Sequence, residues 1–218
     1  ALFNGKDQDS QIEAIISLCD IAISIDAEFC DAYVLKSRCL YNRMFMSEYV
    51  NDRKANEQNF HEVAVAAYNI DANNPEAVSA YSRSFNLKKD YQQRLKYAGL
   101  ALELNPSHAG SNFDYGLALC NEKNFVEAEQ YIEKAIGLDP IGSRRYEGFF
   151  PMLYMAMQNS KQAMLWSNLI YERNQHSRYD GFRAAICAHL GDLKLAKEYL
   201  EIFKSKRPEI FNLDDYKK

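Results

Sequence analysis

The sequence is poor in the residues that interrupt helices. Among its 218 residues there are 9 glycines and 5 prolines, about half the combined share of an average protein. So few chain breakers exclude an all-β protein with many tight turns and favour long helices. Disorder is excluded as well, because 15 tyrosines and 12 phenylalanines are too many for a protein that avoids burial.

The sequence also lacks a basic excess and a long apolar run. Lysine and arginine number 26 against 30 acidic residues, giving a net charge of −4, whereas proteins that bind nucleic acids normally carry a basic surplus. No stretch of 18 uncharged apolar residues and no signal peptide occur. The five cysteines are odd in number and form no Cys-x-x-Cys, which is typical of buried thiols in a reducing compartment. We therefore predict a cytoplasmic protein that binds neither nucleic acid nor membrane.

Motifs that carry chemistry are absent from the sequence. The four histidines form no His-x-x-x-His pair and have no cysteine at zinc-ligand spacing. The glycines form no phosphate-binding loop, and there is no Gly-x-Ser-x-Gly nucleophile turn. We predict no catalytic residue, no metal site and no cofactor, and hence a protein that is not itself an enzyme.

What the sequence does contain is an internal repeat. Similar five-residue segments begin at Ala22, Ala67, Ala101 and Ala135, and each ends in aspartate or asparagine. Their spacings are 45, 34 and 34 residues, and prolines at 106 and 140 are again 34 apart. A fixed period of this length indicates an array of stacked structural units.

The repeat resembles the tetratricopeptide repeat, a helix-turn-helix of 34 residues. The copy at 109–142 matches the family spacing best, with Asn112, Tyr115, Gly116, Leu119, Ala128, Ile132 and Pro140 in the motif positions. Small residues at 82, 116 and 184 suit the close approach of two helices. The resemblance implies an all-α fold, a right-handed superhelical solenoid of antiparallel helix pairs.

We predict a single solenoid domain over residues 1–218 with about six repeats. The first is truncated, with its second helix at about 10–25, and the second carries 11 extra residues around 44–56. Pro151 predicts a kink or a late helix start in the fifth repeat, because proline disrupts a helix interior. The repeats cover about 1–27, 28–73, 74–107, 108–141, 142–176 and 177–210, followed by a tail at 211–218.

A second resemblance concerns the layout of the repeats. The lengthened second repeat, the aromatic-rich fifth and the segment Ala188–Leu193 resemble tetratricopeptide regions of bacterial signalling proteins. Those regions lie C-terminal to class III adenylate cyclase domains or to winged-helix domains of transcriptional activators. Because the sequence opens without methionine, on Ala1–Gly5, which resembles the end of a helix, we expect a fragment of such a larger protein.

In the tetratricopeptide family the first helix of each repeat lines a concave groove. Carried over position by position, the resemblance implies a partner-binding groove made by Arg38, Tyr41, Asn42, Arg83, Asn86, Phe113, Leu117, Asn121, Arg145 and Arg178. Arginine pairs with carboxylates, and asparagine hydrogen-bonds an extended backbone. We therefore predict a protein–protein interaction module whose partner is a protein or peptide with acidic groups or a C-terminal carboxylate.

Two alternatives remain for these arginines and for the partner. The arginines are either free to bind a ligand, or are solvated or paired with Asp31 and Glu76 of the neighbouring repeats, since surface ion pairs are common and weak. A chaperone-binding carboxylate clamp is not expected, because Val34, Ser79 and Phe113 stand where lysine would be needed. Exposed solenoid ends predict association into homo-oligomers.

Overall fold

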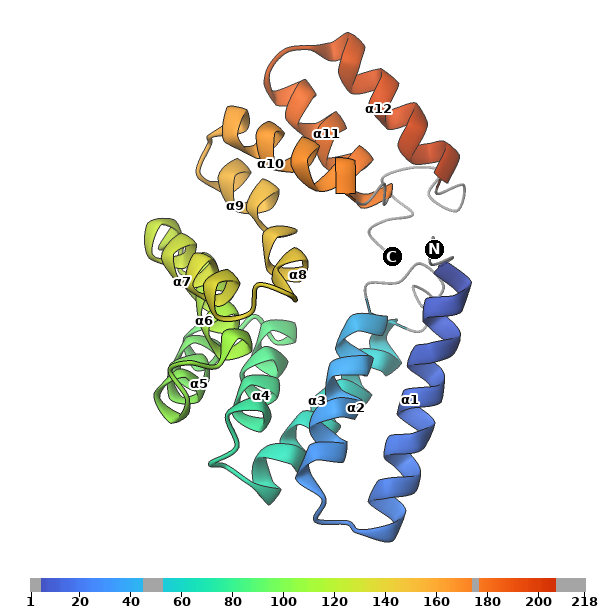
Figure 1. Ribbon diagram of the computed structural model, residues 1–218, viewed down its shortest axis with the longest axis vertical. Coiled ribbons are helices and arrows are strands. Elements are labelled where there is room, and N and C mark those ends of the chain that lie inside the picture. The colour runs from blue at the N-terminus through green and yellow to red at the C-terminus, as the bar shows by residue number, and fades with distance from the viewer. Residues whose placement is uncertain (1–4, 45–52, 174–176, 207–218) are drawn as a thin grey trace. The chain divides into compact units, whose positions relative to one another are not determined.

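The structure is a computed structural model that describes residues 5–44, 53–173 and 177–206 (Figure 1). Throughout these ranges the regular structure is helical, without strands. The extra residues expected around 44–56 fall largely on positions 45–52, and the predicted tail at 211–218 follows the last described residue. Both lie outside the described part of the protein.

The protein forms two compact units, residues 1–122 and 123–218. The boundary falls inside the predicted fourth repeat, and a single domain over the whole sequence stays a prediction. Unit 1 contains α1 (Gly5–Ile25), α2 (Cys30–Arg43), α3 (Arg53–Ile70), α4 (Pro75–Leu87), α5 (Tyr91–Leu104) and α6 (Ala109–Asn121). Unit 2 contains α7 (Phe125–Leu138), α8 (Ser143–Glu147), α9 (Phe150–Ala156), α10 (Ser160–Arg173), α11 (Ser177–His189) and α12 (Leu193–Lys206).

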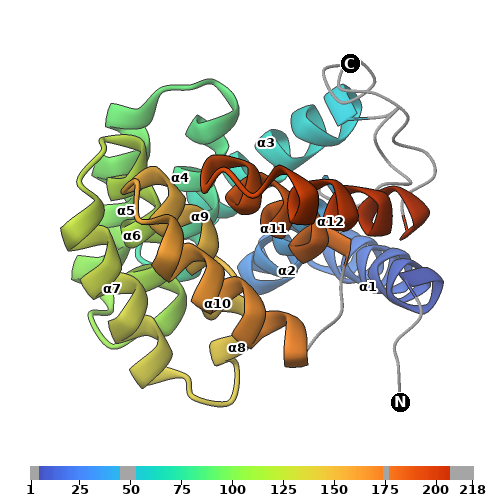
Figure 2. The ribbon, with the colours of Figure 1, turned by 90° about the horizontal axis from the view of Figure 1, so that it is seen from above.

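In unit 1 each helix packs against the next one in the sequence (Figure 1), and the same order can be followed from above in Figure 2. The first helices of successive hairpins also touch one another, α2 with α4 and α4 with α6. Asn74, which caps α4, donates to Asp31 of α2 at 3.3 Å, and the hydroxyls of Ser79 and Ser111 lie 3.4 Å apart. We call the surface formed by α2, α4 and α6 the inner face.

The core of unit 1 is built from the apolar sides of these helices. Phe60 of α3 is fully buried and packs with Ile12 and Ile16 of α1 and Leu40 of α2. Between α4 and α5 the backbones come close, because Ser82 is small enough for its hydroxyl to donate to the Arg94 carbonyl at 2.6 Å. The small residue predicted at position 82 is thus a contact point between two helices.

The turns that follow α4, α6, α9 and α11 repeat the same backbone conformation. Lys89, Lys123, Gln158 and Gly191 all have positive φ, between 55° and 85°, at intervals of 34, 35 and 33 residues. This left-handed conformation is strained for residues that carry a side chain and free of strain for glycine. The structure therefore repeats with the period that the sequence predicts.

Pro151 divides the first part of the fifth repeat in unit 2 into two short helices. The helix α8 ends at Glu147, and α9 begins at Phe150 with Pro151 in its first turn, where proline is tolerated. Gly148 lies between them. A Cβ atom added to this residue would lie 3.0 Å from the Tyr179 hydroxyl. The predicted kink or late helix start at Pro151 occurs as a break between α8 and α9, whereas α1 starts at Gly5, earlier than the predicted residue 10.

Candidate functional site

The inner face carries a set of charged side chains at the point where α2, α4 and α6 begin or run side by side. Arg38 Nη2 of α2 lies 3.9 Å from Glu76 Oε2 of α4, and both side chains are about two-fifths exposed, at 44% and 41%. The other carboxylate oxygen of Glu76 lies 3.5 Å from His108 Nε2. These three residues line a pocket of about 420 Å³ with Asp31, Val34, Leu35, Asn74, Pro75 and Asn105.

His108 has a structural role beside its contact with Glu76. It caps α6, because its Nδ1 accepts from the Ser111 backbone N–H at 3.2 Å. The hydrogen bond with His108 lowers the pKa of Glu76, and the charges of Arg38 and Arg83 act in the same direction against the effect of burial. Glu76 is therefore held as a carboxylate on this face.

Arg83 of α4 is the second arginine of the inner face. Its Nε lies 3.8 Å from Asp114 Oδ2 of α6, too far for a hydrogen bond. Its guanidinium lies 5.4 Å from the ring centre of Tyr41, within cation–π range. Tyr41 packs in turn on Phe60, and burial raises the pKa of its hydroxyl.

Arg94 belongs to this cluster although the sequence analysis did not select it. It lies in α5, is only 4% exposed, and its Nη1 donates to Asn86 Oδ1 at 2.9 Å and to Asn121 Oδ1. The signal was present in the repeat, because Arg94 occupies the position that alanine fills at 128, 163 and 196. Because Arg94 is long and stands where other repeats have alanine, its guanidinium contacts Asn121 of α6 as well as Asn86 of α4.

Unit 1 brings together eight of the ten predicted groove residues on its first helices. Asn42 is exposed, while Tyr41, Asn86, Phe113, Leu117 and Asn121 are half-buried. Arg145 lies in unit 2, where it pairs with Asp139 at 2.7 Å and stacks on Tyr146. The side chain of Arg178 lies outside the described part of the protein.

Of the two alternatives for the arginines, internal pairing occurs. Arg38 pairs with Glu76 of the following hairpin, as the second alternative predicts, and Arg83 pairs with Asp114 instead of Asp31 or Glu76. Both pairs are long, at 3.9 and 3.8 Å, in contrast to the 2.7 Å pair of Arg145. The two inner-face ion pairs are too long for a hydrogen bond between their charged groups.

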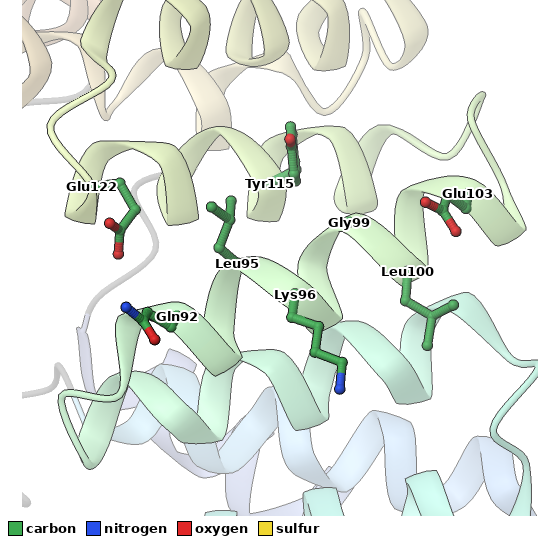
Figure 3. Close-up of a pocket in the computed structure, with 8 residues that line it drawn as sticks. All are labelled: Gln92, Leu95, Lys96, Gly99, Leu100, Glu103, Tyr115 and Glu122. Carbon is green, nitrogen blue, oxygen red and sulfur yellow. The ribbon is translucent and has the colours of Figure 1, made fainter.

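A second pocket, of about 560 Å³, lies on α5 and α6 (Figure 3). Five of its side chains line α5 as Figure 3 shows, around Gly99, and Tyr115 and Glu122 come from α6 and its end. Its charged groups are Lys96, Glu103 and Glu122, and they are not arranged around an unpaired buried donor. We therefore take the inner face as the candidate site.

Several further features concern the described residues alone. Within residues 5–44, 53–173 and 177–206, no group of three or more histidine, cysteine or acidic side chains is placed to hold a metal ion. None of the described helices is long and apolar enough to span a membrane. All five cysteines are free, and burial raises the pKa of Cys120, next to the Arg94 cluster, to about 11.

Comparison with known proteins supports the repeat assignment. Residues 109–141 match the family model of the tetratricopeptide repeat, the same stretch as the best copy in the sequence. No curated protein sequence matches this one.

Three solved structures with a similar fold are distant in sequence. PilF of Pseudomonas aeruginosa is 18% identical, with a TM-score of 0.61 over 81% of this protein and 76% of that one. A structure of the APC/C hetero-tetramer Cut9-Hcn1 is 10% identical, with a TM-score of 0.74 over 95% of this protein and 39% of the matched one. YrrB, a TPR protein with an unusual peptide-binding site, is 16% identical, with a TM-score of 0.52 over 87% of this protein and 92% of that one. The fold is that of a tetratricopeptide helical solenoid.

Proposed function

We propose that the inner face of unit 1 is a non-catalytic docking site for an extended segment of a partner protein that carries acidic groups. The observation that carries this proposal is the pair Arg38 and Arg83. They come from two successive first helices, and each is held by a long ion pair. A partner with carboxylates can exchange with Glu76 and Asp114 as the ligand of these guanidinium groups.

The energetics of the exchange favour a ligand that binds in several places. Exposed ion pairs contribute about 0–1 kcal/mol each, so opening the Arg38–Glu76 pair costs little. A carboxylate that approaches an arginine freely can bind it through two parallel hydrogen bonds, which the long internal pairs do not achieve. The other inner-face side chains, Asn42, Phe113 and Leu117, would contact the backbone and apolar side chains of the segment.

The comparisons support the class of function. YrrB is described as having a peptide-binding site, and Cut9 as part of a hetero-tetramer. The shared fold suggests that this protein is an interaction module. The arginines of the inner face suggest that its partner is acidic.

Binding to peptide pools tests the proposal. We would immobilise two pools of random decapeptides, one that contains aspartate and glutamate and one in which asparagine and glutamine replace them. Wild-type protein should be retained by the acidic pool, and the double variant Arg38→Glu, Arg83→Glu should not. The matched control is Arg144→Glu, Lys161→Glu, which reverses two exposed charges in unit 2. Equal retention of both variants would remove the inner face as the binding site.

We further propose that copies of the protein associate through α1. Leu18, Ile21 and Ile25 are 65%, 56% and 81% exposed on one side of this helix. In the repeat, Leu18 corresponds to Val63, which is 7% exposed because the hairpin covers it. An uncharged apolar stripe of this kind suits self-association. Light scattering should show a mass above the monomer at high concentration that Leu18→Glu, Ile21→Glu abolishes, and a monomeric wild type would refute the association.

A place in a larger bacterial signalling protein remains our proposal for the context of the module. It is supported by the layout of the repeats, with a lengthened connection between α2 and α3 and the turn after α11 at Leu190–Asp192. In that setting the module would regulate a cyclase or a transcriptional activator in the cytoplasm. The full reading frame tests this directly, because an upstream cyclase or winged-helix domain is required.

A further inference from the structure

Arg94 is a buried cation whose charge is not balanced by a direct partner. Its side chain is almost wholly removed from solvent, with 4% exposure, and burial lowers the pKa of its guanidinium. Among the described residues no carboxylate lies within 4.0 Å of it, and its hydrogen bonds go to two neutral amides. A buried charge without a counter-ion is costly.

The surroundings of Arg94 leave an excess of positive charge. Arg83 and Arg94 both act on Tyr41 and Asp114, and Arg83 also acts on Glu76, which is paired with Arg38. Three arginines therefore face two carboxylates. The Nε atoms of both arginines are buried and have no hydrogen-bond acceptor within the described part of the protein. The excess positive charge favours an anionic group of a ligand at this part of the inner face.

Arg94 also determines which side-chain atoms of two asparagines are left to bind other groups. The oxygens of Asn86 and Asn121 both accept from its Nη1, so the side-chain nitrogens remain as the donors of these amides. The two residues stand in the last turns of α4 and α6, and both are half-buried at the inner face. An amide side chain can both donate and accept. Because Arg94 occupies both oxygens, Asn86 and Asn121 are left with only their donor groups.

We propose that Arg94 is the positioning residue of a carboxylate subsite on the inner face, in which Arg83 and the side-chain nitrogens of Asn86 and Asn121 bind a carboxylate of the partner. The inference rests on the proposed function and adds to it the residue that makes the site select anions. The carboxylate belongs either to an acidic side chain or to the C-terminus of the partner, and the chemistry of recognition is the same for both.

A purely structural role for Arg94 makes a different prediction. The C-terminal ends of α4 and α6 carry partial negative charge that favours a nearby cation, and on that ground alone its removal would lower stability. It would leave the preference of the inner face for carboxylates unchanged. The experiment must therefore measure ligand preference as well as folding.

We would titrate the labelled protein with three dipeptides and follow the side-chain amide signals of Asn86 and Asn121 by NMR. Acetyl-Gly-Asp-amide offers a side-chain carboxylate, acetyl-Gly-Ala a terminal one, and acetyl-Gly-Asn-amide neither. In the wild type one or both carboxylate probes should shift the two signals in a saturable way, and the neutral probe should not. The responding probe identifies the source of the carboxylate.

The variant Arg94→Met keeps the length of the side chain and removes its charge and donors. It should weaken carboxylate binding at least about tenfold, in line with the loss of charge-assisted hydrogen bonding, and move the two amide signals even without ligand. The control Arg173→Met removes an arginine that pairs with Glu147 in unit 2 and should leave binding unchanged. If circular dichroism shows that Arg94→Met does not fold, Arg94→Lys takes its place, with weaker binding expected because lysine cannot hold both amides in a planar fork.

Two results would overturn the inference. One is a wild type in which neither carboxylate probe shifts Asn86 or Asn121. The other is a folded Arg94 variant that binds the probe within twofold of wild type. The peptide pools read the proposed function separately, because an Arg94 variant retained by the acidic pool as strongly as wild type ends the role of Arg94 and leaves the role of Arg38 and Arg83 standing.

Discussion

At the scale of single residues, Glu76 shows how the inner face holds its charges. Its carboxylate lies between Arg38 of one hairpin and His108 of the next. The same group that neutralises Arg38 in the free protein would have to give way to a partner. Its ionisation therefore affects both the stability of unit 1 and the accessibility of Arg38.

Glu76→Gln should reveal this coupling through its pH dependence. The pKa of Glu76 is lowered in the folded protein, chiefly by the hydrogen bond with His108, so ionisation favours the folded state. Wild type should be more stable than the variant at pH 7, and the difference should disappear as the pH falls through the lowered pKa. Urea unfolding of both proteins between pH 7 and pH 3 measures it, and a difference that stays constant would contradict the role of the charge.

From the sequence, the location of a single residue in the fold could be predicted only where that residue occupies a known position of the repeat. As the repeat predicts, Arg38 and Tyr41 lie in α2 and Arg83 lies in α4, which are the first helices of their hairpins. The partners of the arginines could not be predicted, since they depend on which carboxylate of a neighbouring helix comes within reach. Arg94 was missed because its position in the repeat indicates a core residue, and only the structure shows that its guanidinium reaches Asn86 and Asn121.

At the scale of the helix, caps decide where each element begins. The side chain of Asn74 accepts from the backbone N–H groups of Glu76 and Ala77 at the start of α4. Asn124 holds the same position before α7 and makes no such bond. The two asparagines therefore form a matched pair.

Asn74→Ala should lower the free energy of unfolding by about 1 kcal/mol, the usual effect of removing a cap. Asn124→Ala should lower it much less. Thermal unfolding followed by circular dichroism compares the two variants with wild type. Equal losses for both positions would show that the cap of α4 contributes nothing beyond an ordinary surface residue.

The turns inside the hairpins give a second prediction at this scale. Lys89 has a φ of 55°, and replacing it by glycine should raise the free energy of unfolding by about 0.5–1 kcal/mol, because strain in the left-handed region is relieved. Lys88, with a φ of −86°, provides the control, since glycine there should lower stability. Chemical unfolding decides the sign, and a destabilised Lys89→Gly variant would contradict the strain.

The helices themselves were largely predictable because their determinants are local. The apolar stripe around Ala128 and Ile132, both fully buried, and the proline at 151 act within one or two turns. The start of α1 was not predicted, since capping residue types occur at Asp7, Asp9 and Ser10 and do not single out Gly5 as the first helical residue. Burial in the hairpin also overrode expectation at Arg94, whose side chain is longer than its position normally accepts.

At the scale of the whole molecule, the regular period explains why the fold could be predicted from the sequence. In unit 1 each helix packs chiefly against its neighbours in the sequence, so a 34-residue pattern contains nearly all the information for one hairpin and its place in this unit. The division at residue 122 has no counterpart in that pattern. The identity of the partner is also absent from it, because binding depends on side chains that the repeat leaves free to vary.

Hydrogen–deuterium exchange with a bound acidic decapeptide tests the central claim most directly, that the first helices of unit 1 form the binding surface. The account predicts slower exchange in α2, α4 and α6 on binding, with α3 and the surface of α5 around Gly99 unchanged. Slower exchange confined to α5 around the pocket of Figure 3, with α2 and α4 unaffected, would contradict it.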